Sequence, residues 1–333
     1  MTIRKSSAMN FFVFFLFFLQ FRTFKCSVFY GDSEKQCKVN LNDGINRCEF
    51  NFQDGSWRKL FISLPVIHNC IKQCSHNEYF FHFKNYSLPA FPNATFSNLQ
   101  NGTLKLEISN GSRIALLSPS LPRYSIFQNS SFNSVIFDIS DSSTLIGWNW
   151  TVLQDLTIIS NKGFEINIVR SKLVYLHSDF NKVAKGNITV VRILKCEMKW
   201  LGKNIFAPLV SLKSLELRDN LLKFISRSQL PRYGSGLRVL DLGKNRLERL
   251  PPDIFEGLNL QTVLLDGNRL KISEMLMENV VNKNQHFAIL GAIWPCKCEA
   301  VFILNFLILY DDVQCYDDIM SDKILNFRQI CLL

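Results

Sequence analysis

The chain has 333 residues, of which 47% are hydrophobic and 20% are charged, with a net charge of +10 and a pI of about 9.1. This composition is that of a folded protein and excludes a largely disordered chain. The positive charge favours weak binding to anionic surfaces, but the basic residues are interspersed with acids and no nucleic-acid-binding motif is present. We therefore expect no nucleic-acid partner.

Residues 1–25 have the layout of a secretory signal peptide. Arg4 and Lys5 precede a solid apolar run over residues 11–19, which is shorter than the roughly 20 residues that cross a bilayer as a helix. No small-residue cleavage motif precedes Cys26, so the cleavage site is placed only between residues 20 and 27, and an uncleaved signal anchor is the alternative. We expect a secreted, extracellular protein without a membrane span.

Ten cysteines support an oxidising compartment, because they cluster near the two ends of the chain. This clustering predicts two disulfide-stapled caps; the alternative is a cytosolic protein with reduced thiols. The cysteines are Cys26, Cys37, Cys48, Cys70 and Cys74 near the start, Cys196 in the middle, and Cys296, Cys298, Cys315 and Cys331 near the end.

Residues 26–76 are expected to form a cysteine-containing N-terminal cap. Two alternating segments, 37–41 and 48–52, flank Asp43-Gly44 and predict a hairpin that would bring Cys37 close to Cys48. Either signal cleavage removes Cys26 or one thiol is left for a partner chain. The segment His68, Cys70, Cys74 and His76 also resembles a zinc-ligand cluster, although its spacing is not that of a standard finger. We expect Cys70 and Cys74 to form disulfides, and we expect no metal or other cofactor.

The dominant pattern of residues 77–286 is the leucine-rich repeat, and residues 237–258 are its clearest copy. They follow L-x-x-L-x-L-x-x-N-x-L and then x-x-L-P-x-x-x-F-x-x-L, the signature of a solenoid coil. The matching residues are Leu237, Leu240, Leu242, Asn245, Leu247, Leu250, Phe255 and Leu258. Further copies cover residues 188–209, 212–222 and 260–270. We call the Asn position the slot; its occupants Cys196, Asn220, Asn245 and Asn268 are 24, 25 and 23 residues apart.

Earlier copies are more degenerate. Strands are expected near residues 81–83, 104–106 and 132–137, then at 153–161 with Asn161 in the slot, and again at 166–176. A single coil cannot bury its own leucines, so the copies must stack. The prediction is an α/β leucine-rich repeat solenoid, or horseshoe, of about eight coils with short parallel strands on its concave face.

Seven Asn-x-Ser/Thr sequons lie in the N-terminal half of the chain, and none follows Asn187. If glycans cover that half, the bare half from residue 188 onward is the better candidate for protein contact. The expected glycosylation sites are Asn85, Asn93, Asn101, Asn110, Asn129, Asn149 and Asn187.

The segment 287–333 carries the order apolar-x-apolar, Trp294, Cys-x-Cys, an apolar run over 301–310, and two further cysteines. This order is similar to the cysteine-flanked C-terminal cap of extracellular leucine-rich repeat proteins. The resemblance implies pairing of Cys296 with Cys315 and of Cys298 with Cys331. Ala292 replaces the Asn that the family carries before the Trp. The chain ends two residues after Cys331, so we expect a soluble secreted solenoid and not a Toll-type receptor.

No enzyme motif was found, and the acidic pairs Asp311-Asp312 and Asp317-Asp318 are more simply solvated cap loops. The concave face is therefore the expected site, because residues between the buried strand leucines project from it. Their mixed charges favour a protein ligand, and reversing the charges of Arg218 and Lys244 is expected to weaken partner binding without altering folding. The candidate partner-binding residues are Arg192, Lys195, Lys213, Glu216, Arg218, Asp219, Arg238, Asp241, Lys244 and Asp266.

Taken together, the cysteine-bearing start, degenerate early repeats and cysteine-capped end resemble the secreted leucine-rich immune proteins of mosquitoes and related flies. This resemblance implies a role in innate immunity, with another leucine-rich repeat chain or a complement-like thioester protein as partner. The chain lacks the C-terminal coiled coil of the longer members, which puts their disulfide-linked heterodimer in doubt. The alternative is an extracellular adhesion or matrix protein on the same scaffold.

Overall fold

The structure is a computed structural model of the full chain. It describes residues 47–56, 78–114, 125–142, 148–268 and 270–273, together with some positions between 58 and 71, residues 275–276, and short strand segments near both ends. Most of the predicted signal segment lies outside the described residues, and so does most of the predicted C-terminal cap. The cysteines that lie outside them include Cys70, Cys74, Cys296, Cys298 and Cys331.

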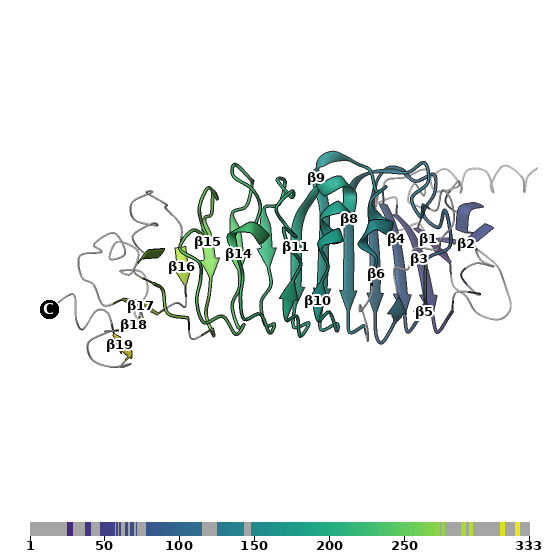
Figure 1. The fold of residues 1–333 in the computed structure, drawn as a ribbon. Helices are drawn as coiled ribbons and strands as arrows, with labels where there is room; N and C mark the ends of the chain where they lie inside the picture. The colour runs from purple at the N-terminus through teal and green to yellow at the C-terminus, as the bar shows by residue number, and fades with distance from the viewer. Residues whose placement is uncertain are drawn as a thin grey trace, which may run out of the picture.

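A twelve-stranded sheet runs the length of the molecule, with its strands side by side in one array (Figure 1). From β3 to β16 every strand pairs in parallel with the strand of the next coil. Parallel pairing between consecutive strands requires that each coil returns to the same edge before the next strand begins. The strands are β1 (Lys25–Val28), β2 (Cys37–Asn40), β3 (Arg47–Gln53), β4 (Glu78–Lys84), β6 (Gln100–Ser109), β8 (Ser131–Ser140), β9 (Ile158–Val169), β11 (Ile188–Leu194), β13 (Ser214–Glu216), β14 (Val239–Asp241), β15 (Thr262–Leu264) and β16 (Ala288–Leu290).

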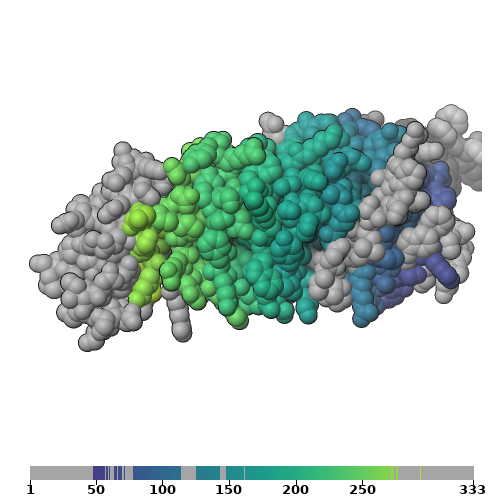
Figure 2. Space-filling view, viewed as in Figure 1, coloured from purple at the N-terminus to yellow at the C-terminus, as the bar shows by residue number. Residues whose placement is uncertain are grey.

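Alternation of apolar and polar residues explains why these segments form strands with one buried face. In β4, Tyr79, Phe81 and Phe83 are buried while the residues between them are partly exposed, and the same pattern continues through β6 and β8. The early coils stack phenylalanines across the interior: the Phe50 and Phe81 rings lie 4.6 Å apart. Later coils place leucines at these positions. All of these side chains belong to one continuous core, and in the space-filling view the later coils, drawn in teal and green, lie directly against one another (Figure 2).

The predicted N-terminal hairpin is wrong. Strand β1 lies between β2 and β3, pairing antiparallel with β2 and parallel with β3, so the segments of Cys37 and Cys48 are not neighbours. In this register Cys26 lies opposite Cys48, which is buried and takes part in a disulfide. Because β3 also pairs with β4 along seven residues, the solenoid sheet extends into the segment predicted as the cap.

The register predicted around Asn161 is also wrong. Residues 158–169 form the single twelve-residue strand β9, so the two strands expected at 153–161 and 166–176 belong to one coil. Gly163 introduces an irregularity into this strand with its left-handed backbone (φ 72°), and the register of β9 shifts near it against both β8 and β11. A side chain at this position would collide with Thr189, since an added Cβ would lie 2.2 Å from its Cγ2 atom.

The return segments contain short 3-10 helices and small two-stranded pairs. The described residues include η1 (Trp150–Leu153), η2 (Ser178–Gly186) and η3 (Arg227–Gln229), with the parallel pairs β5 (Ser87–Leu88) with β7 (Arg113–Ile114) and β10 (Tyr175–Leu176) with β12 (Trp200–Leu201). Helices capable of crossing a membrane are absent from the part of the chain that the structure describes.

Near the C-terminus, β16 extends the main sheet beyond β15. A separate three-stranded sheet follows, in which β17 (Trp294–Pro295) pairs in parallel with β18 (Gln314–Tyr316), and β18 pairs antiparallel with β19 (Ile324–Asn326). The register places Trp294 opposite Cys315. The predicted disulfides of this cap lie outside the described side chains and stay predictions.

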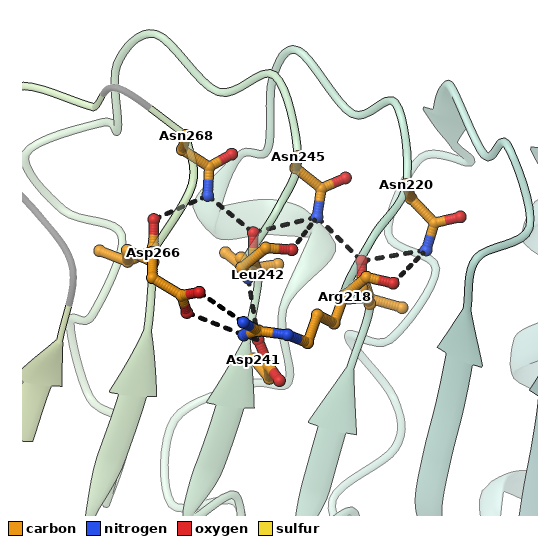
Figure 3. A network of polar contacts seen from close by, with 10 residues as sticks. Arg218, Asn220, Asp241, Leu242, Asn245, Asp266 and Asn268 are labelled. Atoms are coloured by element: carbon orange, nitrogen blue, oxygen red, sulfur yellow. Dashed lines mark hydrogen bonds and ion pairs between the residues drawn. The ribbon is translucent and has the colours of Figure 1, made fainter.

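A ladder of polar side chains closes the turn after each strand, as the slot spacing predicts. Asn245 Nδ2 donates to the carbonyl oxygens of Leu217 (2.9 Å) and Leu242 (3.0 Å), and its Oδ1 accepts from the backbone N–H of Leu222 (3.1 Å). Asn220 and Asn268 make equivalent contacts, so that each slot ties its own coil to the preceding one (Figure 3).

Sequence reasoning missed the slot residues of the early coils. Ser112, Ser142 and Ser171 are buried there, and the Ser112 hydroxyl donates to the Ser109 carbonyl (2.7 Å) and accepts from the backbone N–H of Tyr86 (3.0 Å). Cys196 fills its slot with an unpaired thiol that donates to the carbonyl of Leu194 (3.2 Å), and burial raises the pKa of this thiol to about 11.

Candidate functional site

The ten predicted partner-binding residues fall into three rows on the solenoid. The first row lies on or directly after the strands, on the face opposite the core, and consists of Arg192, Glu216, Arg218, Asp241 and Asp266. A second row, Lys195, Asp219 and Lys244, occupies the turns after the strands, and a third, Lys213 and Arg238, is exposed just before β13 and β14. The structure therefore does not gather all ten residues into one patch.

The first row belongs to a chain of polar contacts that crosses the exposed face from coil to coil. It carries the successive contacts His82 Nδ1–Glu107 Oε2 (3.2 Å), Lys105 Nζ–Asp138 Oδ2 (2.9 Å), Asn167 Nδ2–Asp138 Oδ1 (2.7 Å), Arg192 Nη1–Asn167 Oδ1 (3.2 Å) and Arg192 Nε–Glu216 Oε1 (2.9 Å). Its cations Lys105 and Arg192 are each paired with a carboxylate of the next coil, and Asn167 joins the two pairs. The cations of this face are therefore neutralised, and its side chains are held by contacts between coils.

Arg218 continues this chain across three coils (Figure 3). Its Nη1 atom contacts Asp241 Oδ1 at 3.3 Å in the next coil and Asp266 Oδ1 at 2.8 Å in the coil beyond, and its Nη2 contacts the second oxygen of Asp266. Gly243 makes this reach possible: a Cβ added there would lie 2.2 Å from Arg218 Nη1 and 2.8 Å from Asp266 Oδ1. Glycine thus leaves the room that the guanidinium occupies.

The two carboxylates that share Arg218 differ in their protonation behaviour. The hydrogen bond from Arg218 holds the pKa of Asp266 below its usual value, whereas burial raises the pKa of Asp241. Both carboxylates stabilise the guanidinium, with the Asp266 hydrogen bond as the largest cause, so the pKa of Arg218 is raised. Asp266 is accordingly the stronger ion-pair partner of Arg218.

This geometry corrects the expected effect of reversing Arg218 together with Lys244. A negative side chain at position 218 would face Asp241 and Asp266 without a cation between them, so folding would not be left unaltered. Lys244 is exposed in its turn and has no ion pair within the described residues. It is the safer residue of the two for a test of binding.

Half-buried apolar residues lie among these charges at outward-facing positions of the strands. Val190 and Leu194 flank Arg192 on β11, and Val169 lies beside Leu194 in the register of β9. These residues place accessible apolar surface directly beside the paired charges. A strand pattern alone marks such residues as outward-facing, but the register is needed to see that they adjoin across coils.

The turn row is built on left-handed backbone conformations at equivalent positions of successive coils. The residues with positive φ are Asp54, Asn85, Asn110, Asp141, Arg170, Lys195, Asp219, Lys244 and Gly267. Asn, Asp and Gly tolerate this region best, whereas arginine and lysine are strained there by roughly 1 kcal/mol. Cross-coil pairs support some of them: Asn85 donates to Asp54 (2.7 Å), and Arg170 makes two hydrogen bonds with Asp141.

Of the seven sequon asparagines, Asn85, Asn93, Asn101, Asn110 and Asn129 are exposed. Asn149 and Asn187 are half-buried, and the Asn149 Oδ1 caps η1 by accepting from the Thr151 backbone N–H (3.1 Å). Glycosylation of these residues stays a prediction.

The possible zinc cluster is only partly described. The His68 imidazole contacts the carbonyl of Ala94 (3.1 Å), and the other three residues of the suggested cluster lie outside the described residues. Groups of three or more potential metal ligands are absent from the described part of the chain.

A family comparison agrees with this repeat architecture over part of the chain. The family model described as leucine rich repeat matches residues 210–270, which include β13, β14 and β15 and the slots Asn220, Asn245 and Asn268. No curated protein matches the chain in sequence. Among solved structures, a chain from the octameric complex of Latrophilin 3 (Lec, Olf), Unc5D (Ig, Ig2, TSP1) and FLRT2 (LRR) is similar, with a TM-score of 0.44 and 15% identity over 84% of this chain and 85% of that one. Residues 210–270 are thus leucine-rich repeats, within a solenoid whose parallel coils extend on both sides of them.

Proposed function

We propose that this chain is a secreted recognition protein that binds a protein partner through the exposed face of its parallel sheet. The observation that carries the proposal is the composition of that face. Charged side chains are held in cross-coil pairs from Lys105 to Asp266, and half-buried apolar residues such as Val190 and Leu194 lie among them.

A protein surface suits this face better than a uniformly charged polymer does. The basic groups of the first row are already neutralised by Glu216, Asp241 and Asp266, which leaves little net attraction for a polyanion. A partner with complementary mixed charges gains specificity from the fixed pairs, and it gains binding energy where it covers the apolar residues. Because these pairs are already formed in the free chain, less side-chain ordering is needed on binding.

The resemblance to secreted leucine-rich immune proteins supports a role in innate immunity, with another leucine-rich repeat chain or a complement-like protein as partner. Cell adhesion or matrix interaction is the alternative use of the same surface. The exposed sequons before residue 142 support glycan cover of the early coils, which would leave the coils from β11 onward as the contact region.

The test uses secreted, tagged chain to capture and identify bound proteins from the body fluid of the source organism before and after bacterial challenge. The variant Val190→Glu/Leu194→Glu places two charges on the exposed face of β11. Val210→Glu is the matched control, because Val210 is 54% exposed and lies outside the sheet. Circular dichroism checks that all chains melt alike.

We expect a partner that is retained by the wild-type and Val210→Glu chains and lost with the double variant. Enrichment of that partner after challenge would support immunity, whereas constitutive capture of adhesion or matrix proteins would support the alternative. A partner retained equally by all three chains would contradict binding through this face.

A further inference from the structure

A row of exposed aromatic residues follows the slots of three consecutive coils. The row consists of Tyr175, Trp200 and Phe224, and each of them lies four residues after the slot residue of its coil. Their side chains are 46%, 60% and 61% exposed, in that order. Tyr175 and Trp200 are direct register partners in the pair β10 and β12, at the edge of the molecule where the main strands end (Figure 1). Large apolar rings exposed together on a folded protein are unfavourable in water and mark interaction sites.

Trp200 and Phe224 line a groove of about 590 Å³. Two of its lining residues are joined, because the side-chain amide of Gln229 donates to the carbonyl of Leu201 (2.9 Å). The groove shares no residue with the exposed sheet face.

Three cations, Lys199, Lys223 and Arg246, also line this groove, and no acidic residue is among its lining. Lys199 Nζ lies 5.9 Å from the centre of the Trp200 ring, and within the described residues none of the three cations has an ion pair. The groove therefore combines apolar walls with three cations that form no ion pair among the described residues, whereas the cations of the sheet face are paired.

We propose that this groove, which we call the aromatic groove, is a second docking site that binds a short acidic peptide segment carrying an aromatic or aliphatic side chain. Charge complementarity requires an anionic occupant, and the two rings require an apolar group that fits between them. A long anionic polysaccharide fits less well, because the positive stretch is short: exposed Glu197 lies two residues before Lys199, and exposed Glu248 lies two residues after Arg246. This site does not depend on the proposed function of the sheet face.

The test measures fluorescence anisotropy of the labelled peptide Asp-Glu-Leu-Phe-Glu-Asp with the full secreted chain. The variants are Trp200→Ala/Phe224→Ala and Lys199→Glu/Lys223→Glu. Val210→Ala and Lys203→Glu are the matched controls, since both residues are exposed and lie outside the groove. Every substituted residue is exposed, so folding should be retained, and circular dichroism verifies this for each variant.

We expect saturable binding that both groove variants weaken by at least about tenfold, that added salt weakens, and that both controls leave unchanged. Replacing Leu-Phe in the peptide by Ser-Ser should weaken its binding to the wild-type chain to a similar extent. Lack of saturation up to about 1 mM peptide would overturn the proposal, and so would groove variants that bind the peptide as tightly as the wild-type chain does. Trp200-dependent binding of a heparin oligosaccharide in place of the peptide would overturn it in favour of a polysaccharide.

Discussion

Substitution of Asn245 by alanine tests the ladder that joins the coils. The carbonyls of Leu217 and Leu242 would each lose one of two donors, because Asn220 and Asn268 also donate to them. The backbone N–H of Leu222, in contrast, would lose the side-chain oxygen that it bonds. The Gly243 carbonyl would also lose the Asn245 donor, while it keeps the backbone N–H of Asp219. One buried orphan donor costs about 1–3 kcal/mol and three weakened acceptors add about 1 kcal/mol together, so we expect a loss of roughly 3 kcal/mol in the free energy of unfolding.

Urea denaturation followed by circular dichroism measures this loss, and Cys196→Ala is the matched comparison. The Cys196 thiol makes only weak hydrogen bonds, to the carbonyls of Ile168 (3.4 Å) and Leu194 (3.2 Å). Its removal should cost roughly 1 kcal/mol, mostly as lost packing. If Asn245→Ala unfolds at the same urea concentration as the wild-type chain, the asparagine ladder does not stabilise the coils as proposed. Equal losses in the free energy of unfolding for Asn245→Ala and Cys196→Ala would lead to the same conclusion.

Four further predictions concern the core and the ion pairs. Leu242→Asp places a charge at a fully buried position and should prevent folding, so secretion at wild-type yield with unchanged melting would refute the coil register. Arg218→Glu should lower the free energy of unfolding by roughly 2 kcal/mol whereas Lys244→Glu should not, and equal thermal midpoints would contradict the pairing. Gly243→Ala should displace the guanidinium, so its effect and that of Arg218→Ala should be less than additive in a double-mutant cycle; full additivity would argue against the crossing geometry. Because the pKa of Asp266 lies below its usual value of 3.8, its stabilisation is present above that value and is lost as the pH falls through the lower, folded-state pKa. Asp266→Asn should therefore lower the urea midpoint at about pH 7 and have little effect at about pH 2, and an equal effect at both would exclude the ion pair.

The later coils could be predicted from the sequence because their residues repeat one spacing with one chemistry. Leucines at fixed offsets with Asn220, Asn245 and Asn268 in the slot leave a single consistent register, and the structure has the predicted strands there. The early coils depart from this chemistry. Ser142 and Ser171 take the slot, and a serine at that offset does not stand out in a chain rich in serine.

The arrangement of the site could not be predicted in the same way. Whether Arg218 points to solvent or to another coil depends on Gly243 and Asp266, which lie 25 and 48 residues further along the chain. Only the parallel register brings these three positions into line. The aromatic row was missed for a related reason: Trp200 and Phe224 follow the slot, where apolar residues are expected to be buried, and their exposure appears only in the structure.

The central claim, that the exposed sheet face binds a protein partner, is tested most directly by measuring the affinity of the captured partner for the wild-type chain, Val190→Glu/Leu194→Glu and Val210→Glu by biolayer interferometry. We expect the double variant to bind at least about tenfold more weakly and the control to bind like wild type. Equal affinities for the three chains, with equal melting temperatures, would contradict the account.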